Sequence, residues 1–347
     1  MASVISLFNH KGGVSKTTTA FNLGWKLASK GVRTLLVDAD PQCNLTGMVM
    51  GFKGLDDFSA LASDKQPYNL RDGLAPAFES RPSPIKPVSC AQVGDQANLF
   101  LLPGHIGIAE YEVTLGIAQE LSGSLGALRN LPGSVRYLID ITAKKYKIDC
   151  VLVDMSPSLG PMNQNLTMTS DYFIVPMHPD YFSTMAVHSL AAVLPRWRNW
   201  SSIASESKSL LEASYPFPKV SPKFLGAIIQ KYRPRNGKAS RAFQRWIDEL
   251  EAGLRDVLLP ALISNGMLLD SQKYTDAGFT PDKPLIQMSD FNSLIAASQE
   301  HQVPIFALSD DQLKLGGAIL KNTKKSMQEF DELFNLAANR LITLTSK

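Results

Sequence analysis

The feature that most constrains the fold is a glycine-rich stretch at residues 11–18, KGGVSKTT. It follows the short apolar run of residues 4–8 and precedes residues 19–29, which have a helical pattern. A glycine turn between a strand and a helix N-terminus brings backbone N–H groups together, and the helix dipole adds positive potential there. Such a turn binds phosphate, with Lys16 reaching the β- and γ-phosphates and the Thr17 hydroxyl binding Mg²⁺. We therefore predict a nucleotide-binding loop made of Lys11, Gly12, Gly13, Val14, Ser15, Lys16, Thr17 and Thr18.

Two later apolar runs end in aspartates. Residues 35–37 precede Asp38 and Asp40, and residues 150–153 precede Asp154. Ligands of a parallel sheet bind beyond the carboxyl ends of its strands, so we expect these carboxylates beside the phosphate loop. Each motif alone also fits an ordinary strand followed by a solvated acid. In this order, after the glycine-rich stretch, they favour a site for ATP and Mg²⁺ over a glycine turn that carries two lysines by chance.

Several of these motifs together resemble a known family. The early lysine, Lys11, stands in addition to the usual Lys16, and residues 38–46 (DADPQCNLT), 154–160 (DMSPSLG) and 175–182 (VPMHPDYF) follow. With them the chain resembles the ParA/MinD group of deviant-Walker P-loop ATPases, and most of all its ParA branch, which partitions DNA. The resemblance is dense over residues 1–50 and 148–195 and looser over residues 223–306.

The resemblance implies a set of roles. Lys11, Lys16 and Asp40 would be catalytic, with Lys11 crossing a dimer interface to the partner subunit's phosphates and Asp40 orienting the attacking water. Asp38, Asp154 and Thr17 would organise Mg²⁺. The expected protein dimerises on ATP, binds double-stranded DNA without sequence preference and segregates plasmid or chromosomal DNA. A ParB-like centromere-binding or adaptor protein would stimulate hydrolysis, and the expected location is the cytoplasm, on the nucleoid.

Two residues depart from the family pattern. Ser15 stands where the family usually has glycine, and its Cβ would crowd a phosphate or impose a strained backbone. We expect ATP binding to survive this change and the hydrolysis rate to be altered. Ser156 replaces the usual proline after Asp154, and we expect a mild effect.

Composition and punctuation indicate the organisation. The chain has 347 residues, of which 44% are hydrophobic and 19% charged, enough for a substantial core. Strands alternating with helices predict one P-loop ATPase domain over residues 1–347, with a doubly wound, mainly parallel sheet flanked by helices. Three cysteines without a C-x-x-C pair argue against a zinc ribbon or a disulfide framework. Proline-rich and serine-rich composition predicts insertions at residues 52–98 and 201–222, and terminal helices are expected at residues 313–344.

Net charge is only +3, but the basic residues are clustered. Clusters of this kind bind phosphate backbones without reading sequence, although a solvated helix face is the commoner explanation of such a run. We expect DNA contact through two of them. The candidate residues are Lys231, Arg233, Arg235, Lys238 and Arg241 in the first cluster and Lys321, Lys324 and Lys325 in the second.

Other functions remain open. A MinD-like membrane switch would need a basic amphipathic C-terminal helix, but residues 339–347 lack a bulky aromatic and carry two positive charges. We find no signal peptide and no bilayer-length apolar stretch, and we do not expect membrane association. A metabolic synthetase of the same superfamily would activate a carboxylate with ATP and would not need Lys11. Positioning of a cargo other than DNA is a further alternative.

Overall fold

The computed structural model describes residues 1–51, 67–121, 126–232, 234–235, 238–239 and 241–346. Within these ranges, the side chains of residue 127 and of residues 231–242 fall outside the description. The fold and the site below are built from the described residues alone.

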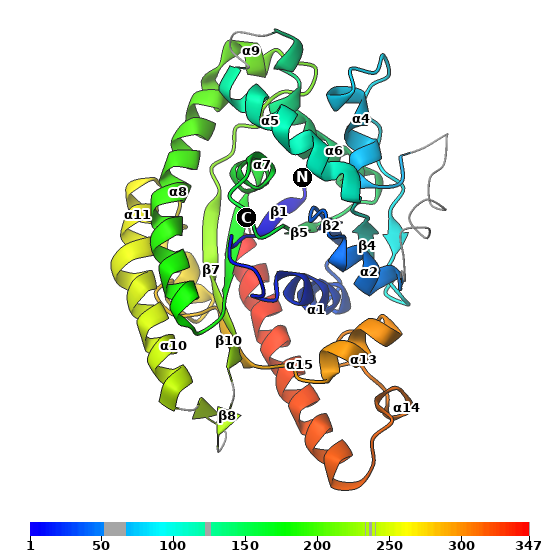
Figure 1. Ribbon diagram of the computed structural model, residues 1–347, viewed down its shortest axis with the longest axis vertical. Coiled ribbons are helices and arrows are strands. Elements are labelled where there is room, and N and C mark those ends of the chain that lie inside the picture. Colours follow the sequence, from blue (N-terminus) through cyan, green and yellow to red (C-terminus); the bar gives the residue numbers. More distant parts are fainter. Residues whose placement is uncertain (52–66, 122–125, 233, 236–237, 240, 347) are drawn as a thin grey trace.

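Eight strands form one sheet through the centre of the molecule, in the order β10-β7-β6-β1-β5-β2-β4-β3 (Figure 1). Neighbouring strands are parallel, except that β3 pairs with β4 in the antiparallel sense at one edge. The predicted mainly parallel sheet is therefore confirmed. The strands are β1 (Ser3–Leu7), β2 (Thr34–Asp38), β3 (Ala91–Gln92), β4 (Leu99–Leu102), β5 (Cys150–Asp154), β6 (Tyr172–Met177), β7 (Lys223–Tyr232) and β10 (Ile286–Ser289), and a separate hairpin joins β8 (Pro234–Arg235) to β9 (Lys238–Ala239).

The central strands are apolar on both faces, so helices cover both. In β5, Val151 and Val153 belong to one buried cluster and Leu152 to the other, because successive side chains of a strand point to opposite faces. β2 divides in the same way, with Leu35 on one face and Leu36 on the other. This two-sided burial makes the sheet doubly wound, as predicted.

The helices divide between these two faces. The face of Leu152 packs against α1 (Lys16–Ser29), α2 (Asn44–Met50), α12 (Ser271–Asp276), α13 (Leu294–His301) and α15 (Gly317–Thr345). The opposite face packs against α4 (Leu70–Phe78), α5 (Ala109–Leu121), α6 (Leu131–Lys145), α7 (Pro161–Thr169), α8 (Tyr181–Glu206), α10 (Arg241–Gly253) and α11 (Leu259–Ser264). Shorter elements are the 3₁₀ turns η1 (Ile106–Ile108) and η2 (Gly126–Leu128), α9 (Lys208–Leu211), the π-helical turn η3 (Leu254–Leu258) and α14 (Asp310–Leu313).

Three segments differ from the sequence expectations or complete them. α8 runs through Pro195 to Glu206, so the first residues of the expected 201–222 insertion continue this helix. Buried Trp197 and Ala204 anchor the helix beyond the proline, and this packing outweighs the lost backbone hydrogen bond. In the described part of the 52–98 segment, α4 includes Pro76 and β3 extends the sheet, while residues 52–66 lie outside the description.

The carboxyl ends of three neighbouring strands meet at one edge of the sheet. Leu7 of β1 lies opposite Asp154 of β5, and Asp38 of β2 lies opposite Asp154 on its other side. The loop that follows β1 leads into α1 and contains residues 11–15. Parallel pairing therefore gathers the three sequence motifs at one place.

Candidate nucleotide site

The phosphate loop has the backbone expected of an anion-binding turn. Gly13 has φ +72° and Ser15 has φ +56°, and α1 begins directly afterwards at Lys16. Val14 is buried and anchors the loop, whereas Gly12 and Gly13 are exposed. The free N–H groups of the first helical turn face an approaching anion here, as at other helix N-termini.

Ser15 adopts the left-handed backbone conformation that glycine would enter without steric cost. Its hydroxyl oxygen is buried and has no hydrogen-bond partner among the described residues. Of the two consequences expected from sequence, the structure has the positive φ. The effect of Ser15 on hydrolysis stays a prediction.

Lys16 is buried inside the loop, with 7% of its surface exposed. Its Nζ donates to the backbone carbonyl of Asn9 at 2.9 Å and to that of Lys11 at 3.3 Å. Burial lowers the pKa of Lys16, and the nearby Asp154 and Asp40 partly offset that effect. An ammonium held by carbonyls in this way can turn to a phosphate without leaving the loop.

Asp154 is a buried carboxylate without a hydrogen-bond partner among the described residues. Burial, reinforced by the adjacent Asp38, raises its pKa to about 8, although the Thr17 hydroxyl and Lys16 act in the opposite direction. Leaving a carboxylate unpaired inside a protein costs free energy unless a ligand or a proton compensates. Asp154 is therefore the strongest signal for a cation in this region.

Asp38 has a different environment. Its Oδ2 accepts hydrogen bonds from the Thr46 backbone N–H at 2.8 Å and the Thr46 hydroxyl at 2.6 Å, and its Oδ1 accepts one from the Asp40 N–H at 3.2 Å. Burial raises its pKa to about 6, and the bonds from Thr46 and Asp40 limit the rise. The carboxylate thus ties α2 to β2, and a role toward Mg²⁺ stays a prediction.

These residues fit Mg²⁺ only if phosphate and water complete its coordination. Among the described residues, no group of three or more His, Cys, Asp or Glu side chains could hold a metal ion by itself. Mg²⁺ in nucleotide sites commonly binds one or two protein oxygens together with waters and phosphate oxygens. The unpartnered Asp154 carboxylate and the Thr17 hydroxyl at the start of α1 suit that arrangement.

Next to the loop lies a cavity of about 340 Å³. Its lining contains residues 12–18 and Asp40, as expected from sequence. Asp40 is 7% exposed, and its Oδ1 accepts a hydrogen bond from the Gln42 N–H at 2.9 Å. Among the described residues, the lining also includes five that the sequence had not suggested, namely Asn44, Met48, Pro157, Ile295 and Gln299.

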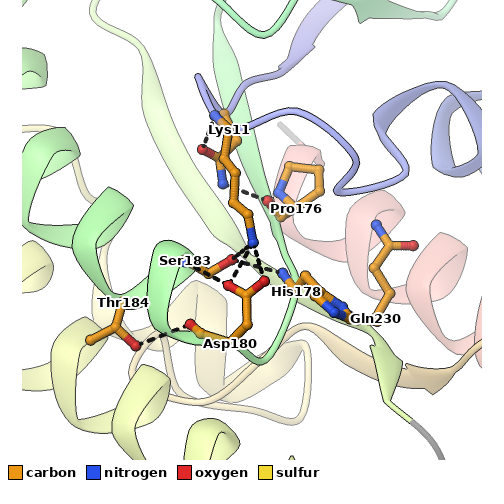
Figure 2. Close-up of polar contacts among 8 residues, drawn as sticks. Lys11, Pro176, His178, Asp180, Ser183, Thr184 and Gln230 are labelled. Carbon is orange, nitrogen blue, oxygen red and sulfur yellow. Dashed lines mark hydrogen bonds and ion pairs between the residues drawn. The ribbon is translucent and has the colours of Figure 1, made fainter.

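Lys11 points away from this cavity, toward the start of α8 (Figure 2). Its Nζ lies 2.5 Å from both carboxylate oxygens of Asp180 and 3.1 Å from the Ser183 hydroxyl. Asp180 also caps α8, since its Oδ1 accepts from the Ser183 N–H at 2.8 Å. Partial burial raises the pKa of Asp180, but the bonds from Lys11 and Ser183 outweigh it and hold the pKa below its ordinary value.

Two polar side chains from neighbouring segments support the loop. Gln230 of β7 donates to the Val14 carbonyl at 2.7 Å, and Asn9 donates to the Pro176 carbonyl at 2.8 Å (Figure 2). Asn9 also accepts the Lys11 N–H at 2.9 Å. Sequence reasoning missed both residues, although a glutamine that ends the apolar run of residues 224–229 is a signal that could have been used.

The two basic clusters are only partly described. Of the first, Arg233 lies outside the described residues, as do the side chains of Lys231, Arg235, Lys238 and Arg241. In the second, Lys321, Lys324 and Lys325 are exposed on the first turns of α15. Lys324 pairs with Asp310 at 2.7 Å, so the acid-free sequence around it is not acid-free in space.

Comparison with known proteins identifies the family. A family model described as an AAA domain matches residues 2–202. An uncharacterized protein of Methanocaldococcus jannaschii is 31% identical over 250 residues, covering 72% of this chain and 79% of that protein. The chromosome-partitioning ATPase Soj of Thermus thermophilus is 32% identical over 194 residues, covering 56% of this chain and 62% of Soj.

The chain belongs to the ParA/MinD family of P-loop ATPases. An ATP complex of McdA from Cyanothece shares the fold of this ParA/MinD family member, with a TM-score of 0.54 and 15% identity over 94% of this chain and 95% of McdA. Within the described residues, no helix is both long and apolar enough to cross a membrane.

Proposed function

We propose that the chain is a ParA-like ATPase that dimerises on ATP, binds double-stranded DNA without sequence preference and positions that DNA. A ParB-like centromere-binding or adaptor protein would stimulate hydrolysis, and the protein would act in the cytoplasm on the nucleoid. The family membership supports an ATPase of the partition type. The finer steps rest on the arrangement of two lysines.

The observation that carries the proposal is the separation of Lys16 from Lys11. Lys16 is buried within the loop beside the cavity, whereas Lys11 leaves the loop and binds Asp180. A single nucleotide in this cavity would thus have Lys16 as the loop cation that holds its phosphates. Lys11 is then available to another subunit's nucleotide once it leaves Asp180, as a dimer would require.

For hydrolysis, each described side chain receives one task. Lys16 and the N–H groups of residues 12–18 bind the phosphates, and Thr17 and Asp154 are positioned to hold Mg²⁺, which would neutralise phosphate charge. Asp40 lines the cavity and would orient the attacking water. Because orientation contributes to transition-state geometry, Asp40→Ala should slow hydrolysis far more than it weakens ATP binding.

DNA binding is assigned to the basic clusters. Lys321, Lys324 and Lys325 span one turn at the exposed start of α15, where residues three and four apart share a face. Each phosphate that they neutralise would release condensed counterion, so association should weaken steeply with salt. A dimer doubles the number of such contacts, which links DNA binding to ATP.

One observation bears on the MinD-like alternative. Leu341 and Leu344, near the end of α15, are each 1% exposed and belong to the core. A terminal helix with its apolar face buried in the protein has no free apolar face for a lipid surface. The packing of α15 therefore favours the DNA-positioning function over membrane association.

The deciding experiment is duplex binding measured with ATP, with ADP and without nucleotide across a range of stated salt concentrations. The proposal expects tight binding with ATP alone, independent of sequence and falling steeply with salt. Three coincident curves would remove the DNA switch. ATP-dependent dimers that bind no duplex would instead favour a cargo other than DNA.

A further inference from the structure

The outward face of α5 carries an apolar stripe. Val113, Ile117 and Leu121 follow one another at intervals of four residues, which places them on one side of the helix. They are 70%, 46% and 44% exposed, respectively. The opposite side of α5 fills the core through Tyr111, Leu115 and Ala118, so the α5 stripe is not needed to hold the helix in place.

The charges around the stripe have one sign. Between Ala109 and Leu121 the sequence has three glutamates, Glu110, Glu112 and Glu120, and neither lysine nor arginine. Arg71 of α4 pairs with Glu110 at 3.0 Å and thus offsets one of them. A complementary surface would therefore combine apolar side chains with basic ones.

The same charges argue against a second copy of this chain on the stripe. In a twofold contact each copy presents the same patch, so the glutamates of one α5 would approach those of the other. That repulsion is absent when the occupant is basic. A short stripe of three side chains also suits a small, transient contact better than an obligate interface.

The buried side of α5 is connected to the loop that follows Asp154. Gln119 donates from Nε2 to the Pro161 carbonyl at 2.9 Å, at the start of α7. Gly160 lies so close to Glu112 that a Cβ there would collide with the carboxylate. At its other end the same loop places Pro157 against Gly12 of the phosphate loop.

We propose that the α5 stripe is a docking surface for a basic amphipathic helix of a partner protein, and that docking there acts on hydrolysis through Gln119 and the 154–161 loop. Only the effect on hydrolysis rests on the proposed function, because docking itself requires no ATP. Lysine or arginine side chains of the partner would face Glu112 and Glu120, and its apolar face would cover Val113 and Ile117. Figure 1 shows α5 at the margin of the molecule, above α7 and away from α15.

The probe is a synthetic 18-residue helical peptide with leucines along one face and lysines on both flanks. A scrambled peptide of the same composition controls for charge alone, and a version with glutamate in place of lysine controls for its sign. We expect the basic amphipathic peptide to bind the wild-type chain at least about tenfold more tightly than either control.

Variants locate the binding. The pair Val113→Ser with Ile117→Ser, and separately the pair Glu112→Gln with Glu120→Gln, should each weaken peptide binding by about tenfold. Ile263→Ser is the matched control, since Ile263 is a 62% exposed isoleucine on α11. All four positions that are changed on α5 lie on or beside its outward side, and unchanged thermal unfolding will establish that the variants fold.

Gln119→Ala separates docking from its effect. It should leave peptide affinity unchanged and abolish the change in ATP hydrolysis that the peptide produces in the wild-type chain. A chain that binds the peptide at the α5 stripe but lacks ATPase activity would keep the docking surface and reject the proposed function. Equal binding of the basic and scrambled peptides would overturn the docking surface. So would loss of ATP-dependent self-association in the Val113→Ser, Ile117→Ser variant, which would assign the stripe to a second copy.

Discussion

Lys11 and Asp180 form an ion pair within one chain, with Nζ 2.5 Å from both carboxylate oxygens. The two residues are 169 positions apart, and their side chains are 17% and 31% exposed. If Lys11 serves the phosphates of a second subunit, this pair must break before the dimer is complete. The pair then sets part of the free-energy cost of dimerisation.

Replacing Asp180 by Asn should therefore favour the dimer. Asparagine can still accept the Ser183 N–H and cap α8, but it lacks the charge that holds Lys11. A half-exposed pair contributes about 1 kcal/mol, so the ATP concentration at the midpoint of dimerisation should fall about fivefold. Light scattering during an ATP titration measures the midpoint. Asp270→Asn, at the cap of α12, is the control, and an unchanged Asp180→Asn midpoint would mean that the pair does not restrain Lys11.

Lys11→Ala should keep much of the affinity for ATP and lose both ATP-dependent dimers and hydrolysis. The reason is that Lys11 lies outside the cavity lining, whereas the residues that line it are retained. Calorimetry measures ATP affinity, and sedimentation measures the dimer. Unchanged ATP-dependent dimerisation would refute a role for Lys11 in the second subunit.

Lys16→Ala should abolish productive binding of Mg-ATP, with a loss of affinity of at least about 100-fold, because charge-assisted bonds to phosphate disappear. Lys30→Ala, just beyond the end of α1, is the control, since Lys30 is exposed and remote from the loop. Isothermal titration calorimetry measures both. Wild-type affinity in the Lys16 variant would sink the phosphate-loop assignment.

Asp154→Asn should stabilise the nucleotide-free protein, and more so at high pH. The raised pKa, about 8, means that the folded carboxyl binds its proton more tightly than the unfolded one. Stability from this group is therefore fully present below the unfolded pKa near 4 and is lost as pH rises toward 8. Removing the charge should restore roughly 2 kcal/mol at pH 8 and little at pH 4.

Thermal unfolding at the two pH values tests that expectation. The same variant should lose the tightening of nucleotide binding by Mg²⁺, which calorimetry with and without the ion measures. Equal stabilisation at pH 4 and pH 8 would contradict an unpaired, ionisable Asp154.

Changing Lys321 and Lys325 together to Glu should weaken duplex binding and flatten its salt dependence. Each phosphate contact contributes about 0.9 to the slope of log affinity against log salt, so two lost contacts per chain should lower the slope by about 2. The same change at Lys324 should have a smaller effect, because Asp310 already pairs with it. Equal slopes for all variants would assign these lysines to solvent.

Much of the site was predictable because its residues are close in sequence. Residues 12–18 line the cavity as expected, since a strand, a glycine turn and a helix start form a local unit. Asp40 also lines it, and Asp154 ends its strand beside Leu7. The parallel sheet was predictable for a similar reason, because apolar strands that alternate with helices leave few other arrangements.

Ile295, Gln299 and Gln230 could not be placed in the same way. They reach the loop or its cavity from α13 and β7, more than 200 residues along the chain, and no local pattern gives the distance between such segments. Pro195 was also misjudged, because local propensity predicts a break where the burial of Trp197 keeps α8 intact.

The amino-acid sequence by itself determined the phosphate loop, the aspartates at the strand ends and the family, because these depend on residue type and short spacing. Only the tertiary structure decided what each charge meets. It paired Lys11 with Asp180, surrounded Asp38 with Thr46, left Asp154 without a partner, and brought Asp310 to Lys324. Electrostatic interaction and desolvation depend on distance and burial, and folding sets both for residues that are far apart in the chain.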